Sequence, residues 1–432
     1  MSSNAQPQPA PLTVDAFALR GRLVRGSGEP IEGAIVIDGG KVVAIESPIV
    51  AARLPRRCLD APFIAPGFVD LQVNGGFGFE VAGDPAALRA LAARLPQTGV
   101  TSFLPTLVSA TERDYERAFA AFREAANAKT SDTSVTSVTS AVSAVSANSG
   151  QPSRGARMLG LHLEGPLLSP ARAGAHDPAI IEAATRALVE RLADPQIVRL
   201  ITLAPERSEA LALIALLKAR GITVALGHTD ASFAAFTAGV DAGATLATHV
   251  FNAMSAFHHR APGATGAALT DDRVTALMIA DGVHTHPAAF QLAARAKGLD
   301  RLGLVTDAMA GAGLPPGLST LGGRAVIVDA TSARLVEGDG RAATLAGSTL
   351  TMDKAVRNAL TFAGLTPAQA IYMATEIPAR AADLAPQGRL TVGAPADVVL
   401  LDEDLVVSAT FVGGVLVYSH DPSGASTRPL RA

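Results

Sequence analysis

LGLHLEG, residues 159–165, is the stretch that decides the fold, because this short apolar run delivers a carboxylate, Glu164, at its end. Four more apolar runs end on a residue that can bind a metal or carry a proton. They are TVALGH at His228, ATLATH at His249, ALMIADGVH at His284 and LGLVTD at Asp307. In a (β/α)8 barrel the carboxyl ends of the parallel strands meet at one mouth, where such enzymes keep their active sites. The pattern therefore predicts a barrel whose chemistry lies at that mouth.

Eight nearly continuous apolar runs are the candidate strands of this α/β barrel. They span residues 63–73, 100–108, 158–164, 197–205, 223–228, 244–251, 275–280 and 302–307. Continuous apolar character is typical of strands buried on both faces. Helical periodicity between the runs, as in residues 85–95, 180–192 and 208–220, predicts βα connections. A doubly wound open sheet would accept the same alternation, but its functional residues gather near one switch point instead of recurring around the strands.

Both ends of the chain are strand-like and predict a second, smaller unit. In residues 33–45 a Gly-Gly pair joins two apolar runs, as in a hairpin, and residues 388–402 and 409–419 are again short strands with turn residues between them. Isolated hairpins need additional strands to become stable. We therefore predict a small β-sandwich domain formed by both chain ends, from residues 13–61 and 380–425, beside a TIM-type barrel at 62–379.

Two segments are predicted to lie outside this organisation. Residues 1–12 are polar and contain proline, so we expect a mobile tail. Residues 130–153 are a low-complexity run of Ser, Thr, Ala and Val, interpreted as a flexible loop without chemistry. An interaction tether is the alternative for that loop.

Composition excludes several classes of protein. Of the 432 residues, 48% are hydrophobic and 17% charged, which is typical of a compact protein and not of a disordered one. The net charge of −3 gives no basic field for nucleic acid or a membrane surface, although a pocket for one small anion stays open. The single cysteine, Cys58, is interpreted as structural and suits a reducing compartment. Without a secretory signal or a membrane-length apolar segment, we expect a cytoplasmic protein.

Glu164, His228 and His249 form the candidate metal site. A carboxylate and two imidazoles suit zinc or ferrous iron, and a catalytic site usually takes three protein ligands and leaves one position for water. Each residue alone has a structural alternative, because a strand-end histidine is more often a satisfied polar residue than a ligand. A carboxylate buried between apolar residues, however, requires a cation or strong donors nearby. The three together predict a metal centre.

Asp307 is the candidate proton carrier. An aspartate beside a metal can accept the proton of the attacking water and later return it to the leaving nitrogen. The metal would lower the pKa of that water toward about 7 and polarise the carbonyl under attack. Capping of the following turn is the structural alternative for this residue.

Five motifs carry a resemblance to a known family. Residues 65–76 (APGFVDLQVNGG), 162–176, 226–231, 248–254 and 304–309 resemble those of the N-acetylglucosamine-6-phosphate deacetylases, a family within the amidohydrolase superfamily. The motifs occur in the right order over nearly the whole chain. The resemblance implies a TIM-type barrel and a small β-sandwich domain built from both chain ends.

The resemblance also implies roles for individual residues. Glu164, His228 and His249 would bind the metal, Asp307 would act as general base and acid, and His176 would polarise the acetyl carbonyl. The substrate would contact Gln72, Ala175, Asn252, Ala253, Arg260, His284, Ala346, Gly347 and Ser348. An arginine and a cationic imidazole suit a phosphate group. Without the family, Arg260 would be interpreted as a solvated loop charge.

One motif departs from the common superfamily pattern. Many amidohydrolases have His-x-His after the first strand, whereas this chain has Gln72-Val73-Asn74. An amide oxygen is a poorer zinc ligand than imidazole, so we predict one catalytic metal. Zinc is the first candidate, with iron, manganese and cobalt as alternatives. Gln72 is alternatively an outer partner that orients ligands or water.

The expected activity is removal of the N-acetyl group from N-acetylglucosamine 6-phosphate, giving glucosamine 6-phosphate and acetate through attack by a metal-bound hydroxide. Two alternatives stay open: hydrolysis of N-acetylgalactosamine 6-phosphate or another N-acyl amide, and a non-catalytic barrel scaffold. A scaffold would typically lack one of the four metal and proton-carrying residues, and all four are present. The family further implies a homodimer, with Arg260 acting in its own subunit or across the interface.

Overall fold

The computed structural model describes residues 13–47, 57–127, 155–336 and 342–420. The predicted tail at 1–12 and the predicted loop at 130–153 lie outside these residues. Among the described helices, none is both long and apolar enough to cross a lipid bilayer.

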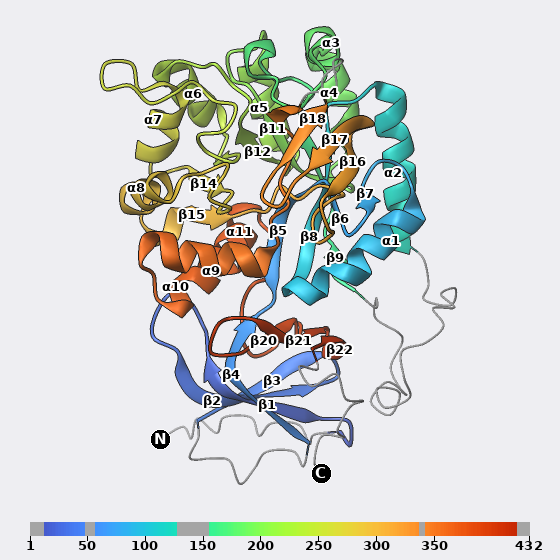
Figure 1. Cartoon of the computed structure of the whole chain (residues 1–432), viewed down its shortest axis with the longest axis vertical. Coiled ribbons are helices and arrows are strands. Elements are labelled where there is room, and N and C mark those ends of the chain that lie inside the picture. The colour runs from blue at the N-terminus through green and yellow to red at the C-terminus, as the bar shows by residue number, and fades with distance from the viewer. Residues whose placement is uncertain (1–12, 48–56, 128–154, 337–341, 421–432) are drawn as a thin grey trace, which may run out of the picture.

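Eight parallel strands form the central barrel (Figure 1). In chain order they are β5 (Phe68–Val73), β8 (Val100–Val108), β10 (Leu161–Glu164), β11 (Val198–Leu203), β12 (Thr223–Leu226), β13 (Leu246–Ala247), β14 (Thr275–Met278) and β15 (Leu302–Leu304). Each strand pairs with the next one in this order, and a short strand, β9 (Arg157–Met158), adds to β8. The predicted fold class is confirmed, and each of the eight predicted runs contains one barrel strand.

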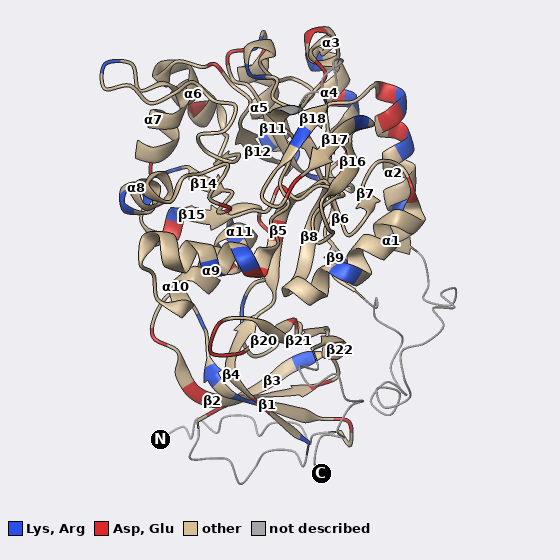
Figure 2. Cartoon of the chain, in the orientation of Figure 1, with Lys and Arg blue, Asp and Glu red and all other residues tan. Residues whose placement is uncertain are grey.

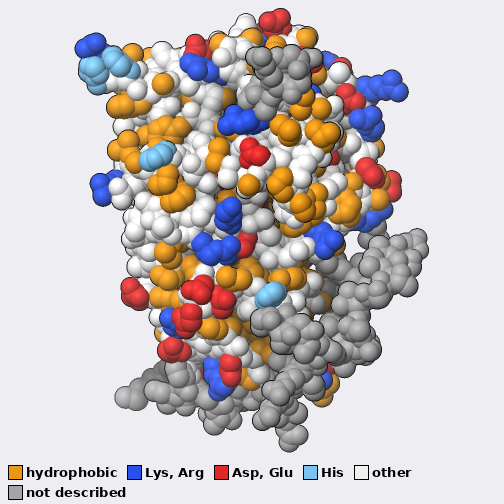
Figure 3. Space-filling view, viewed as in Figure 1, with side chains coloured by type: hydrophobic (Ala, Val, Ile, Leu, Met, Phe, Trp, Pro, Cys, Tyr) orange, Lys and Arg blue, Asp and Glu red, His pale blue; other side chains and the backbone are white. Residues whose placement is uncertain are grey.

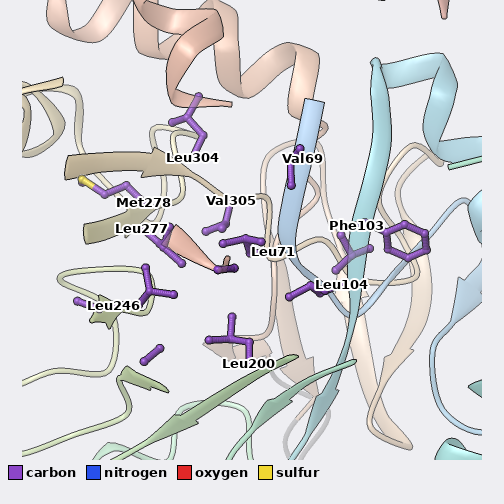
Figure 4. Packing of buried hydrophobic residues seen from close by; sticks show 14 of the residues in the cluster. Val69, Leu71, Phe103, Leu104, Leu200, Leu246, Leu277, Met278, Leu304 and Val305 are labelled. Atoms are coloured by element: carbon purple, nitrogen blue, oxygen red, sulfur yellow. The ribbon is translucent and has the colours of Figure 1, made fainter. Parts of the chain in front are cut away.

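The barrel is held by a continuous apolar core. Figure 4 shows side chains of β5, β8, β11, β13, β14 and β15 packed close together, including Leu71, Leu104, Leu200 and Leu277. Nearly every residue of these strands is buried, which is why their sequences lack the polar alternation of a half-exposed sheet. Barrel packing of this kind leaves chemistry to the strand ends.

Helices cover the outside of the barrel (Figure 1). They are α1 (Pro85–Arg94), α2 (Glu112–Asn127), α3 (Pro178–Ala183), α4 (Arg186–Leu192), α5 (Ala210–Ala219), α6 (Phe233–Ala242), α7 (Gly263–Thr270), α8 (Pro287–Lys297), α9 (Met352–Ala363), α10 (Pro367–Met373) and α11 (Glu376–Ala381). The helical periodicity at 180–192 is confirmed, but the segment forms two helices, α3 and α4, and not one. Ala184 is extended there, and the Thr185 side chain accepts a hydrogen bond from the Leu188 N–H, which starts a new helix.

Strands from both chain ends build one seven-stranded sheet below the barrel (Figure 1). They are β1 (Phe17–Leu23), β2 (Ile31–Asp38), β3 (Lys41–Glu46), β4 (Cys58–Pro66), β20 (Val398–Leu401), β21 (Val407–Val412) and β22 (Val415–Ser419). β4 joins the two groups, because it pairs with β1 in parallel and with β20 in antiparallel. The expected domain division after residue 61 falls inside β4, and the division at these residue numbers stays a prediction.

A four-stranded antiparallel sheet after the last barrel strand was not predicted. It consists of β16 (Gly317–Leu321), β17 (Arg324–Val328), β18 (Ala333–Val336) and β19 (Ala342–Leu345). Its buried side chains pack on Met309, on Val108 at the end of β8 and on Ala175 in the loop after β10, so the sheet lies at the carboxyl end of the barrel. The sequence contains a signal for this sheet, because Gly322-Gly323 joins β16 to β17 as Gly39-Gly40 joins β2 to β3.

Charges are distributed over the surface without a dominant sign. Figure 2 shows the positions of lysine and arginine along the ribbon interspersed with those of aspartate and glutamate, and Figure 3 shows both kinds of side chain on the face in view. This agrees with the small net charge of the chain.

Candidate metal centre

Glu164, His228 and His249 converge at the barrel mouth, as the sequence predicts. Glu164 is the last residue of β10, and the histidines lie two residues beyond β12 and β13. Glu164 Oε1 is 3.2 Å from His228 Nε2 and 2.9 Å from His249 Nε2. All three side chains are buried, and one ligand atom from each lies within 4.8 Å of the others. This is the ligand type and number expected of a catalytic divalent metal.

The hydrogen bonds around the cluster fit a metal ion. His228 Nδ1 lies 2.8 Å from the Arg172 carbonyl oxygen, to which it can only donate, so the neutral ring keeps the lone pair of Nε2 for a ligand. Gln72 Nε2 donates to Glu164 Oε1 at 2.8 Å. Burial would raise the pKa of the Glu164 carboxyl, but its hydrogen bonds, that with His176 first, hold the pKa well below its usual range. The carboxylate therefore stays charged, as ligation requires.

His176 lies beside the cluster and presents an N–H to it. The Ser109 backbone N–H donates to His176 Nδ1 at 3.0 Å, so the proton of the neutral ring resides on Nε2. His176 Nε2 is 3.6 Å from Glu164 Oε2. Burial lowers the pKa of His176, which favours this neutral form. The ring is thus a preset hydrogen-bond donor at the mouth.

Asp307 and Asn74 form a buried pair that sequence reasoning missed. Asn74 Nδ2 donates to Asp307 Oδ1 at 2.6 Å. Burial, followed by the charge of Glu164, raises the pKa of Asp307 to about 6, while the Asn74 hydrogen bond acts in the opposite direction. A signal existed, because Asn74 is two residues beyond Gln72 and shares its face of the strand. In this chain the Gln72 amide therefore donates to the Glu164 carboxylate, and the Asn74 amide donates to the Asp307 carboxylate.

Three of these residues have left-handed backbone conformations. φ is 46° at His228, 28° at His249 and 51° at Asp307. Non-glycine residues rarely adopt such values, and they cluster at functional sites where the surrounding structure enforces them. Around Asp307 the Gln72 carbonyl accepts its N–H at 2.9 Å, and its own carbonyl accepts the Ser348 N–H at 2.7 Å. The strand ends are therefore bent to aim these side chains.

Residues 346–348, which are predicted to contact the substrate, pack beside the backbone of Asp307 in this structure. Ala346 is buried under the β16–β19 sheet. Gly347 has a φ of 60°, and a Cβ there would lie 3.0 Å from the Asp307 carbonyl oxygen. The Ser348 hydroxyl donates to the Thr306 carbonyl at 2.6 Å. Their contact with a substrate stays a prediction.

Other predicted substrate residues lie on the neighbouring loops. Asn252 Nδ2 donates to the His249 carbonyl at 3.2 Å, and the Ala253 carbonyl accepts the Thr229 N–H at 3.0 Å. The Ala175 carbonyl accepts a hydrogen bond from Arg324 at 2.9 Å.

His284 and Arg260 differ in where the structure places them. His284 Nδ1 lies 2.6 Å from Asp281 Oδ2, and its charge is one of the influences on the pKa of Asp307, so it lies near the mouth. Arg260 is exposed on the loop before α7, where its side chain contacts His259 at 2.9 Å. None of its contacts among the described residues joins it to the metal cluster.

Comparisons with known proteins agree with this geometry. A model of the amidohydrolase family matches residues 63–417. The N-acetylglucosamine-6-phosphate deacetylase of Homo sapiens is 38% identical over 420 residues, covering 93% of this chain and 95% of the human protein. The N-acetylgalactosamine-6-phosphate deacetylase of Escherichia coli O157:H7 is 36% identical over 399 residues, covering 91% and 97%.

A solved structure is also similar. It is a mutant N-acetyl-D-glucosamine-6-phosphate deacetylase from Mycobacterium smegmatis in complex with N-acetyl-D-glucosamine-6-phosphate. The TM-score is 0.81 at 33% identity, and the match covers 94% of this chain and 100% of that one.

Proposed function

The chain belongs to the amidohydrolase family, and from this premise we propose that it hydrolyses N-acetylglucosamine 6-phosphate to glucosamine 6-phosphate and acetate. The observation that carries the proposal is the convergence of Glu164, His228 and His249 at one barrel mouth with Asp307. Relatives of that activity share 33–38% identity with nearly the whole chain. A barrel scaffold without activity would have no use for the buried carboxylates and bent strand ends of this mouth.

Glu164, His228 and His249 would hold one divalent cation. When bound there, the cation acidifies a water molecule and polarises the acetyl carbonyl. We propose zinc, since a carboxylate and two imidazole nitrogens are ligands that zinc accepts readily.

Asp307 moves the proton in the proposed reaction. A carboxyl with a pKa of about 6 is mostly ionised at neutral pH, so it can take the proton of the attacking water. The oxygen of that water bonds to the acetyl carbon, the C–N bond breaks, and the proton passes from Asp307 to the leaving nitrogen. Asn74 keeps the Asp307 carboxylate oriented through both transfers.

His176 stabilises the charge that develops on the acetyl oxygen. Its Nε2–H is fixed by the Ser109 N–H on the other ring nitrogen, so no reorientation is needed during the reaction. Gln72 orients Glu164 through its amide N–H. Its amide oxygen is buried without a partner among the described residues, and we propose that a substrate group donates to it.

The sugar phosphate is proposed to bind Asn252, Ala253, His284 and Arg260. Asp281 orients the His284 ring through the hydrogen bond at Nδ1, and an imidazole suits a phosphate. Arg260 would act across the interface of a homodimer, because it lies on an exposed loop with Phe257, whose side chain is 57% exposed. A phosphorylated substrate and a chain with one cysteine also suit the cytoplasm.

N-Acetylgalactosamine 6-phosphate is the second candidate substrate. The Escherichia coli relative with that name is 36% identical to this chain, close to the 38% of the human protein.

An acetate-release assay with quantified metal tests the proposal. The purified protein would be given both sugar 6-phosphates and N-acetylglucosamine without phosphate. We expect one equivalent of metal per chain and much higher kcat/KM for a phosphorylated sugar. Absence of acetate from both phosphates by the metal-loaded protein would refute the function, and the ratio between them decides the epimer.

A further inference from the structure

A buried carboxylate, that of Asp70, lies at the seam between the first and last strands of the barrel. In the described sheet, β5 and β15 are the two ends of the strand order, and a bridge joins Val73, the last residue of β5, to Ala308 beyond β15. Asp70 lies in the middle of β5 and is 1% exposed. It accepts hydrogen bonds from Thr306 Oγ1 at 2.6 Å and from the Thr306 N–H at 3.2 Å. Nearer the mouth, the Gln72 carbonyl accepts the Asp307 N–H at 2.9 Å and the Ala308 carbonyl accepts the Asn74 N–H at 2.8 Å, and Asp70 adds a side-chain link across the same seam.

Thr306 in turn fixes the backbone on both sides of Asp307. Its hydroxyl oxygen accepts the Ala308 N–H at 3.2 Å, and its carbonyl accepts the Ser348 hydroxyl at 2.6 Å. Asp307 lies between these anchored residues in the left-handed conformation. A backbone in this region must be held by its surroundings. The hydroxyl of Thr306 is thus placed to aim the Asp307 side chain.

Asp70 also reaches the other side of the mouth. Its Oδ1 atom accepts the Gln72 N–H at 3.2 Å, and the Gln72 side chain donates to Glu164. The same oxygen accepts the Thr306 N–H. One carboxylate therefore ties the residue that orients Glu164 to the residue that precedes Asp307. Burial of a carboxylate lowers the stability of a fold unless the carboxylate has such partners. An apolar residue at this position would therefore fill the seam with a smaller loss of folding free energy.

We propose that Asp70 and Thr306 are a positioning pair, which sets the place of the Asp307 carboxylate relative to Glu164 across the barrel seam. Neither residue touches the substrate, and both act through Asp307 and Gln72. The inference rests on the proposed function, because it takes Asp307 as the proton carrier.

Substitution of Thr306 tests the pair directly. Thr306→Val keeps the shape of the side chain and removes the hydroxyl, and we expect kcat to fall on the order of 10- to 100-fold with little change in KM or bound metal. Thr306→Ser returns the hydroxyl and should restore most of the lost turnover. Thr410→Val is the matched control, because it removes an equally buried hydroxyl, bonded to the Pro96 carbonyl at 2.7 Å, and should leave kcat unchanged.

A double-mutant cycle separates positioning from general damage. In an Asp307→Asn background, Thr306→Val should not reduce the residual turnover further, because its effect passes through the lost carboxylate. Asp70→Asn provides a second route: it should lower kcat as Thr306→Val does, and the two losses should not add. Thermal midpoints and metal content of each variant show whether the fold and the metal site persist.

Three outcomes would overturn the pair: full additivity with Asp307→Asn, equal losses in Thr306→Val and Thr306→Ser, or a rise in KM at constant kcat. The proposed function fails separately, when the wild-type protein itself releases no acetate from either sugar phosphate.

Discussion

The barrel mouth and the seven-stranded sheet of the chain ends are built on opposite principles. The sheet encloses an apolar cluster that includes Leu19, Ile35, Ile64 and Phe411, and its ion pairs lie at the surface, as with Arg20 and Asp60. The mouth instead buries ionisable groups and bends three strand ends into left-handed conformations. Apolar burial stabilises a fold, whereas buried charge and backbone strain oppose it.

The sheet residues therefore act mainly on the stability of the chain, and the mouth residues act mainly on its proposed activity. Side chains of the sheet stabilise the folded state and have no role in the proposed reaction. Residues at the mouth are tolerated because the rest of the barrel, with its continuous core, holds them in place. Substitutions in the two regions should therefore change different observables.

The largest effect is expected from Glu164→Ala. Loss of the carboxylate removes one proposed metal ligand and the shared partner of two histidines, so turnover should fall by roughly 10³-fold or more. Metal analysis and acetate release measure this. Glu403→Ala is the control, since that carboxylate is exposed beside the sheet and should change neither. Retained metal and turnover in Glu164→Ala would remove the metal centre from the mechanism.

Asp307→Asn should have the next largest effect. The amide can neither accept nor return the proton, so kcat should fall by roughly 10²- to 10⁴-fold while the metal content stays the same. Steady-state kinetics with metal quantification check this. Turnover at the wild-type rate would assign the proton transfer to another group.

Ile35→Ala should reverse the pattern of the mouth variants. Ile35 is fully buried in the sheet cluster, so the cavity should lower the free energy of unfolding by about 2–5 kcal/mol. Denaturant unfolding measures that loss, and acetate release at a permissive temperature should show an unchanged kcat. A fall in kcat for a protein that is still folded would mean that the sheet and the mouth are coupled.

The smallest effect is expected in the pH profile. Asp307 must be ionised to accept a proton, and burial raises its pKa to about 6. A bound cation lowers that pKa, so kcat/KM should decline only as the pH falls below about 6. In Asn74→Leu the hydrogen bond that lowers the pKa of Asp307 is gone, and the decline should begin at a higher pH. An unshifted acid limb in this variant would contradict the role given to Asn74.

Local patterns account for what was predictable. Each barrel strand is a continuous apolar run, and Glu164, His228, His249 and Asp307 lie at or just beyond the ends of such runs. Since parallel strand ends share one mouth, their convergence follows from the pattern alone. The break between α3 and α4 was missed because a single threonine cap overrides a helical periodicity.

By itself, the sequence determined the barrel, the small sheet from both chain ends and the members of the Glu164, His228 and His249 cluster, because all three depend on short-range periodicity and on strand direction. Only the tertiary structure decided the partners: Gln72 donates to Glu164 across 92 residues, and Asn74 to Asp307 across 233. Hydrogen bonds form within about 3 Å, and such distances are set by how whole elements pack. The tertiary structure also decided three other features, because each depends on contacts between residues far apart in the chain. They are the left-handed strand ends, the proton position on His176 and the seam at Asp70.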